Sequence, residues 1–196
     1  MKVGLPYFTK AFSSKTLCLP TVKPHEQKRT LLMVCRGVHF AITPDVMEIL
    51  LKASNDQALI EIIQETIEEK WEKEWLCQTD KAWDAIHRCL TDGRLEYDNG
   101  TFPLNHCILG GENLHHGDNY IISLVRPEKV GAVAEALQSI TEQDMRTRYF
   151  QLDPIDYDGE IGEDDFDYSW NWFTGLPKLF HKASQKGRAV IFTVDQ

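Results

Sequence analysis

The sequence predicts an α+β fold, in which several helices pack on a small sheet within a single domain. Three segments have the pattern of strands: residues 38–42 alternate in polarity, residues 120–125 are mostly apolar, and residues 189–194 form a continuous apolar run. Between them, apolar residues recur at helical spacing in several segments, and such an order of elements favours an α+β arrangement. The 196 residues, 42% of them hydrophobic, suffice for one large core and are few for two domains.

Residues 1–32 differ from the rest of the chain in charge. They hold six Lys or Arg and one acidic residue and so sum to +5, whereas residues 33–196 sum to −14 and the whole chain to −9. They also contain three prolines and no sustained apolar periodicity. We therefore expect residues 1–32 to be a disordered extension from an upstream start, and residues 33–196 to form the domain.

Proline and apolar periodicity locate the first two helices. Pro44 opens a helix that extends to Ala53, because proline lacks the N–H that stays unpaired at a first helical position. Asn55 or Asp56 caps a longer helix over residues 57–76, with glutamates and lysines between its apolar positions. We interpret these charged residues as a solvated face, and the alternative is an acidic docking surface for a basic partner.

Residues 79–93 predict a complete helix. The first residue, a threonine, is a good N-cap, and the last, a glycine, can take the left-handed conformation that ends a helix. At about 100° per residue, a polar stripe with Asp80 and Asp84 runs beside an apolar arc, and His87 lies between the two. We expect the acidic side chains to be exposed to solvent. The apolar arc consists of Ala82, Trp83, Ile86, Cys89 and Leu90.

The second half of the chain predicts a turn, a strand and further helices. Gly110 and Gly111 indicate a tight turn before a strand over residues 120–125. Without a G-x-G-x-x-G motif or a Walker lysine, the two glycines do not predict a nucleotide-binding loop. Pro127 starts a helix, and Thr141 caps a short one. The remaining predicted elements are an acidic loop from Asp153, an aromatic segment over 166–173, a helix over 177–186 and the closing strand.

Four segments carry a resemblance to a known family: residues 35–40, 79–93, 108–111 and 187–196. Together they resemble the YfbM-like family of bacterial proteins, a family of domains of unknown function. The resemblance covers residues 33–196 and implies an α+β fold of the YfbM type and a bacterial host. It implies no activity.

Composition excludes several classes of function. No apolar run approaches the roughly 18 residues that span a bilayer, so we expect a soluble protein with no membrane partner. The charge of −9 disfavours nucleic acid and favours a basic protein as the partner. Five cysteines without a Cys-x-x-Cys pair indicate neither a disulfide framework nor a zinc site, and fit a reducing cytoplasm. We predict no cofactor.

The strongest catalytic candidate is Asp84 three residues before His87, with Asp80 one turn earlier. A carboxylate that orients an imidazole is the arrangement of a general base, and Trp83 can supply a stacking surface for a ligand. The alternative is an ordinary pair on a helix surface, which contributes about 0.2–0.5 kcal/mol. The cations available for an anionic substrate are Arg36, Arg146 and Arg148.

Two further groups suggest binding sites. His106, His115 and His116 flank the two glycines together with Cys107, but their spacing fits no regular metal motif, and turn or surface positions are the simpler interpretation. In the acidic loop, three residues fall at ligand positions of a calcium-binding loop whose first ligand position is occupied by a proline. These residues are Asp156, Asp158 and Asp165. An acidic loop stabilised by the following helix is the alternative.

The sequence thus predicts a protein that acts by binding and has no chemistry of its own. A regulatory or immunity-like role, in which it masks a basic toxin or enzyme, is one concrete form. The alternative is a hydrolase or transferase that acts on a small anionic substrate with an Asp/His site on the 79–93 helix. Convergence of Trp83, His87, an arginine and the glycine turn on one deep cleft would favour the enzyme.

Overall fold

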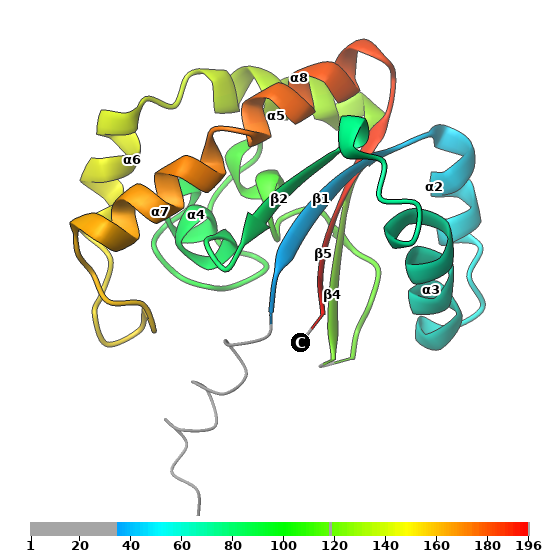
Figure 1. Ribbon diagram of the computed structural model, residues 1–196, viewed down its shortest axis with the longest axis horizontal. Helices are drawn as coiled ribbons and strands as arrows, with labels where there is room; N and C mark the ends of the chain where they lie inside the picture. Colours follow the sequence, from blue (N-terminus) through cyan, green and yellow to red (C-terminus); the bar gives the residue numbers. More distant parts are fainter. Residues whose placement is uncertain (1–34, 118, 196) are drawn as a thin grey trace, which may run out of the picture.

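A computed structural model describes residues 35–117 and 119–195 and contains one antiparallel sheet (Figure 1). The predicted extension over residues 1–32 lies outside the described residues. The strands are β1 (Gly37–Ile42), β2 (Leu76–Asp80), β3 (Glu112–Asn113), β4 (Tyr120–Val125) and β5 (Ala189–Asp195). They lie in the order β2-β1-β5-β4-β3, so the C-terminal strand is central and pairs with both β1 and β4. The predicted single α+β domain is confirmed.

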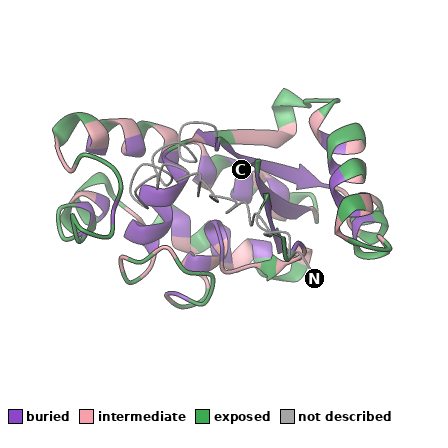
Figure 2. Cartoon of the chain, turned by 90° about the horizontal axis from the view of Figure 1, so that it is seen from below, coloured by how far each residue is buried: buried purple, intermediate pink, exposed green. Residues whose placement is uncertain are grey.

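Helices cover both faces of this sheet. Figure 1 shows α2 and α3 on one side and the later helices on the other, and Figure 2 shows that their exposed residues face outward. The helices are α2 (Pro44–Leu51), α3 (Asp56–Ile63), α4 (Trp83–Leu90), α5 (Pro127–Gln138), α6 (Glu142–Tyr149), α7 (Glu163–Phe173) and α8 (Leu176–Gln185). A π-helical turn, η1 (Gln64–Glu68), and two 3₁₀ turns, η2 (Lys73–Trp75) and η3 (Leu104–Cys107), accompany them. Along the described part of the chain, no helix has the length and apolar character that a membrane crossing requires.

The two layers of helices give the sheet two hydrophobic cores. Phe40 and Ile42 of β1 pack with α2 and α3, whereas the alternate residues of β1 face α8. His39, for example, is buried between the rings of Phe180 and Phe192, whose centroids lie 6.1 and 4.6 Å from its own. Every residue of β1 is buried. The predicted half-buried strand is therefore a strand that is covered on both faces.

The predicted helix over residues 57–76 is wrong in its second half. After α3 and the π-helical turn, the chain reverses at Trp71, which has a left-handed φ of 43°, and residues 76–80 form β2. Trp71 and Trp75 continue the helical spacing of apolar residues in the sequence. In the structure, however, their rings pack against other elements and do not extend the apolar face of α3. The Trp71 ring contacts Phe40 at 5.7 Å, and the guanidinium of Arg188 lies 3.7 Å from the ring centroid of Trp75. Tertiary contacts override the local pattern here.

The predicted helix over residues 79–93 begins later than expected. Thr79 lies in β2, where its buried hydroxyl donates to the Gly37 carbonyl at 3.1 Å instead of capping a helix. Asp80 then has a φ of 45°, and α4 starts only at Trp83. The predicted stop is confirmed, since Gly93 has a φ of 86° and its N–H donates to the Arg88 carbonyl. All members of the predicted apolar arc are buried.

Close packing at Gly37 gives a test of the junction between β1, β2 and α4. A Cβ at this position would lie 2.6 Å from the Thr79 hydroxyl oxygen, 2.7 Å from Phe192 and 2.9 Å from Trp83. We therefore expect Gly37→Ala to lower the free energy of unfolding by about 1–3 kcal/mol in urea denaturation. Gly131→Ala is the matched control, because nothing lies within 4 Å of that Cβ in α5 and the change should stabilise by about 0.4–1 kcal/mol. Equal effects of the two changes would contradict the packing at Gly37.

Candidate functional site

Two acidic segments that lie far apart in the sequence line one cleft, which we call the acidic cleft. Asp84 comes from the start of α4, and Asp158 and Asp165 come from the loop before α7 and its first turn. The cleft has a volume of about 230 Å³. Its other lining residues are Lys81, Ala82, Tyr157, Gly159, Tyr168 and Ser169. Carboxylates and hydroxyls therefore outnumber the one cation in the lining.

Arg88 positions Asp84, one of the residues that line the acidic cleft. Its Nε donates to an oxygen of Asp84 at 2.5 Å, one helical turn earlier in α4, and both side chains are buried. The same guanidinium donates to the carboxylate of Asp156 at 2.6 Å and to its carbonyl at 3.1 Å, so it also holds the acidic loop. Burial raises the pKa of Asp84, and the attraction of Arg88 opposes that rise. Asp84 is thus a buried, paired carboxylate and not part of the exposed polar stripe that the sequence predicts.

Two tyrosines orient Asp165 at the other side of the cleft. The hydroxyls of Tyr149 and Tyr157 donate to one of its carboxylate oxygens at 2.6 and 2.7 Å. Burial raises the pKa of each tyrosine, and the nearby carboxylate raises it further. The tyrosines thus remain protonated donors, and they hold the carboxylate in one position.

Ser169 leaves unused hydrogen-bonding capacity at the cleft. Its side chain in α7 is fully buried, and its hydroxyl has no hydrogen-bond partner among the described residues. Asp158, which also lines the cleft, forms no ion pair within the same part of the chain. Buried polar groups are nearly always paired, so the Ser169 hydroxyl keeps a hydrogen-bonding capacity at this cleft that the described residues do not use.

The calcium-loop hypothesis gains no support from these contacts. Asp158 and Asp165 both line the acidic cleft, but Asp156 is turned toward Arg88 and does not line it, so the three predicted ligands do not converge on one point. Within residues 35–117 and 119–195, no group of three or more His, Cys, Asp or Glu side chains is placed to hold a metal ion.

The structure does not pair Asp84 with His87. The ring of His87 is fully buried, and its Nε2 donates to the Glu96 carbonyl at 3.0 Å. Its Nδ1 has no hydrogen-bond partner among the described residues, so the carboxylate of Asp84 does not orient the ring. Burial lowers the pKa of His87 to about 4. A general base needs access to a substrate proton, and this imidazole is enclosed.

The other binding candidates are dispersed. Trp83, His115 and His116 line a different hollow of about 360 Å³, which β4 borders and which Asp84 does not line. His106 lies apart from them on η3, where it contacts Asn105. Trp83, His87, an arginine and the glycine turn therefore do not converge on one cleft.

Each predicted arginine already has a partner within the chain. Arg36 lies 3.4 Å from Asp80, whose carboxylate also accepts the hydroxyl of Tyr168 at 2.9 Å. Arg146 pairs with Glu163 and stacks on two phenylalanine rings. Arg148 donates to the Cys89 carbonyl at 3.1 Å. These contacts engage all three arginines within the chain.

Sequence reasoning missed three residues of this region: Arg88, which holds Asp84, and Tyr157 and Ser169, which line the acidic cleft. Arg88 has a visible signal, since it lies four residues after Asp84 on one helical face. Tyr157 and Ser169 have none, because their roles depend on how α7 docks beside α4. Arg188 likewise lines a cleft that no local motif indicates.

Comparison with known proteins places this fold. Residues 33–193 match the family described as a domain of unknown function, DUF1877. In the solved structures, the chain is similar to YfbM of Escherichia coli, a protein of unknown function, with 18% sequence identity and a TM-score of 0.61. The match covers 81% of this chain and 99% of YfbM, and at this identity it shows the fold alone. No curated protein matches the chain significantly. The chain therefore belongs to the DUF1877 family and has the fold of YfbM.

Proposed function

We propose that the protein acts by binding a basic protein partner and performs no chemistry of its own. The acidic cleft is the contact site, and it accepts a lysine or arginine side chain of the partner. The observation that carries this proposal is the convergence of Asp158, Asp165 and the unpaired Ser169 hydroxyl in one cleft. An ammonium or guanidinium group has only N–H donors to offer, and such a lining supplies acceptors for them.

The surroundings of the cleft suit a partner with several basic side chains. Residues 153–167 contain eight Asp or Glu residues and no Lys or Arg. Glu160, Glu163 and Asp164 line an adjoining hollow that shares Asp165 and Tyr168 with the cleft. A surface of one charge sign steers an oppositely charged partner and increases its rate of association.

A regulatory or immunity-like role is one form of this function. A basic toxin or enzyme commonly uses its positive surface to bind its own substrate, and an acidic protein that covers that surface blocks it. The alternative of a hydrolase or transferase receives less support, because Asp84 pairs with Arg88 and His87 is enclosed.

Affinity capture with matched variants tests the proposal. The wild-type chain and the variant Asp158→Asn/Asp165→Asn, which removes two charges and keeps side-chain size, are used to capture proteins from native lysate. We expect the wild type to retain one stoichiometric basic protein, and the variant to bind it at least about tenfold more weakly. Affinity should also fall as salt concentration rises.

Glu65→Gln/Glu69→Gln is the control, because both glutamates are exposed, lie near the end of the α3 segment and are equally charged. The control should bind the partner as the wild type does, and thermal melting should show that all three proteins are folded. A partner that binds the two double variants equally would contradict the assignment to the acidic cleft. Failure to capture any stoichiometric protein would contradict the proposed function.

A further inference from the structure

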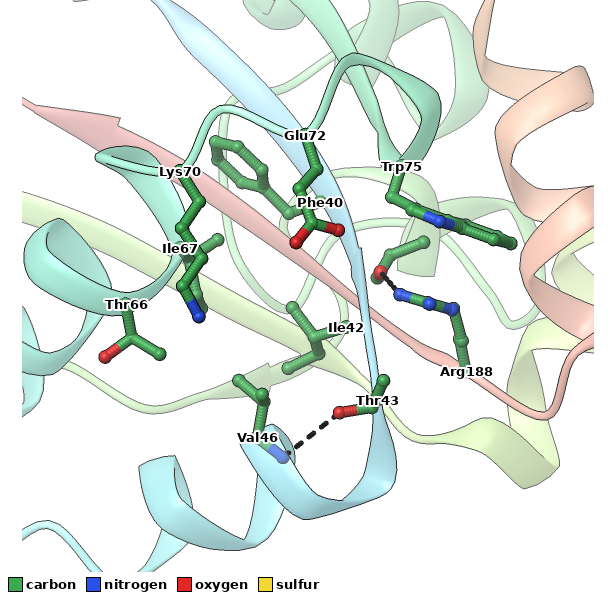
Figure 3. A pocket seen from close by; sticks show the side chains of 11 residues that line it. Phe40, Ile42, Thr43, Val46, Thr66, Ile67, Lys70, Glu72, Trp75 and Arg188 are labelled. Carbon is green, nitrogen blue, oxygen red and sulfur yellow. Dashed lines mark hydrogen bonds between the residues drawn. The ribbon is translucent and has the colours of Figure 1, made fainter.

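A second cleft, which we call the edge cleft, lies where β1 runs into α2 (Figure 3). It has a volume of about 270 Å³. The lining residues are Phe40, Ala41, Ile42, Thr43, Val46, Thr66, Ile67, Lys70, Glu72, Trp75 and Arg188. None of them lines the acidic cleft, so a ligand of the edge cleft is independent of the proposed function.

The edge cleft exists because β2 pairs with only part of β1. Pairing between these strands ends at Phe40 and Leu76, whereas β5 continues along β1 as far as Ile42. One side of Ala41 and Ile42 therefore has no strand partner among the described residues. The chain from η1 to η2 arches past this open side and closes the cleft in part.

The backbone that frames the cleft is unusual in two places. Thr66 and Ile67 line the cleft from a π-helical turn, a conformation that is rare and occurs often at functional sites. A few residues later, Trp71 has a left-handed φ of 43°, which is strained for a bulky side chain. Such strain persists where surrounding structure enforces it, and it is concentrated at ligand sites and switches.

Arg188 is fixed at one side of the cleft with N–H groups to spare. One nitrogen donates to the Ala41 carbonyl at 2.8 Å, and the guanidinium carbon lies 3.7 Å from the ring centroid of Trp75. In the described part of the chain Arg188 forms no ion pair. A guanidinium has five N–H donors in a planar fork, so a preorganised one that uses a single donor can still bind a carboxylate.

The remaining lining defines a ligand with one negative charge and an apolar body. Figure 3 shows Lys70 on the opposite side from Arg188, with Glu72 between them, so the lining carries two positive charges and one negative charge. Ile42, Val46 and other apolar side chains, together with the Trp75 indole, line the space between these groups. An apolar pocket of roughly 150 Å³ holds benzene, so this one has room for about ten to twelve non-hydrogen atoms.

We propose that the edge cleft binds a small organic monocarboxylate. The carboxylate accepts hydrogen bonds from the free N–H groups of Arg188, and the apolar body lies against Ile42, Val46 and the indole of Trp75. Lys70 adds attraction at longer range.

An NMR titration with 3-phenylpropanoate, a carboxylate of suitable size, tests this site. We expect saturable shifts of the Trp75 indole N–H with a dissociation constant in the millimolar range or below, as is normal for so small a ligand. The neutral isostere 3-phenylpropanamide should bind at least about tenfold more weakly, because it cannot form a charge-assisted bond with Arg188. Equal binding of acid and amide, or no saturable shift for the acid, would overturn the proposal.

Variants test whether the ligand is bound by Arg188 itself or attracted only by the general charge of the surface. Arg188→Gln should weaken 3-phenylpropanoate binding at least about tenfold, whereas Arg126→Gln, at an exposed pair with Glu112, should leave it unchanged. If Arg188→Gln does not fold, Lys70→Gln replaces it, since that side chain is exposed, and a loss of about threefold is expected. If Arg188→Gln folds and binds 3-phenylpropanoate as tightly as the wild type, the ligand binds elsewhere and the proposal is overturned. If Arg188→Gln does not fold, unchanged affinity of Lys70→Gln overturns it in the same way.

Discussion

Replacing Arg88 with methionine is expected to lower the free energy of unfolding by about 3–5 kcal/mol. Arg88 and Asp84 are 4% and 5% exposed, so removal of the guanidinium leaves a carboxylate charge buried without its partner. The change also releases Asp156 and the Gly93 carbonyl, both of which accept hydrogen bonds from Arg88. Urea denaturation at pH 7 measures the loss. Arg126→Met, at an exposed pair with Glu112, is the control and should cost less than about 1 kcal/mol.

The pH dependence of that loss identifies its cause. Without Arg88, burial raises the folded-state pKa of Asp84 above its unfolded value near 3.9. In the Arg88→Met variant, protonation of Asp84 therefore relieves the cost of the buried charge. This relief is complete below the unfolded-state pKa of Asp84 and is lost as pH rises through its folded-state pKa. The deficit of Arg88→Met should thus be largest at pH 7 and shrink toward pH 4, and adding Asp84→Asn should recover part of it at pH 7. A deficit that is independent of pH would indicate lost packing and not an unpaired charge.

Local signals in the sequence were sufficient for most elements of the fold. Prolines at the first helical position mark the starts of α2 and α5, and Thr141 forms a capping box with Asp144 at the start of α6. The apolar runs predict β4 and β5 correctly. Each of these signals acts within a few residues, so no knowledge of the rest of the chain is needed to interpret it.

The failures arise where distant contacts decide the conformation. Leu76–Asp80 continues a segment with helical spacing, but it becomes a strand because β1 offers an edge to pair with. Trp71 leaves the helical conformation while its ring packs on Phe40, which lies in a strand much earlier in the sequence. An edge strand and a left-handed tryptophan have no signature in a single sequence.

The candidate site shows the same division. The sequence identifies the acidic residues, yet positions three and four residues apart on a helix are equally able to pair, so it does not choose between His87 and Arg88 as the partner of Asp84. The choice depends on Asp156, which lies 68 residues after Arg88 and engages its guanidinium. Convergence of two acidic segments in one cleft likewise results from the docking of α7 beside α4.

Acidification from pH 6.5 to about 4 is expected to destabilise the fold through two buried imidazoles. His39 and His87 are both fully buried, and burial lowers the pKa of each to about 4. In this window the unfolded chain binds protons that the folded chain does not, so stability rises with pH and falls as the pH is lowered. Because burial lowers each pKa from 6.5 to about 4, protonation across this window costs on the order of 3 kcal/mol for each histidine.

Urea denaturation at several pH values between 7 and 4 tests this expectation, with variants that remove one imidazole at a time. Because carboxylates also titrate near the lower limit, the informative quantity is the difference between variant and wild type at each pH. At pH 7 the wild-type imidazole is neutral and packs well, so His87→Gln should be less stable than the wild type. Near pH 4 the wild type is destabilised because its buried imidazole resists protonation, so the stability of the variant should approach that of the wild type. His116→Gln, at an exposed position, should follow the wild type throughout. If the difference for His87→Gln stays constant with pH, the imidazole is not held neutral by burial, and the enclosure that argues against its role as a base is contradicted.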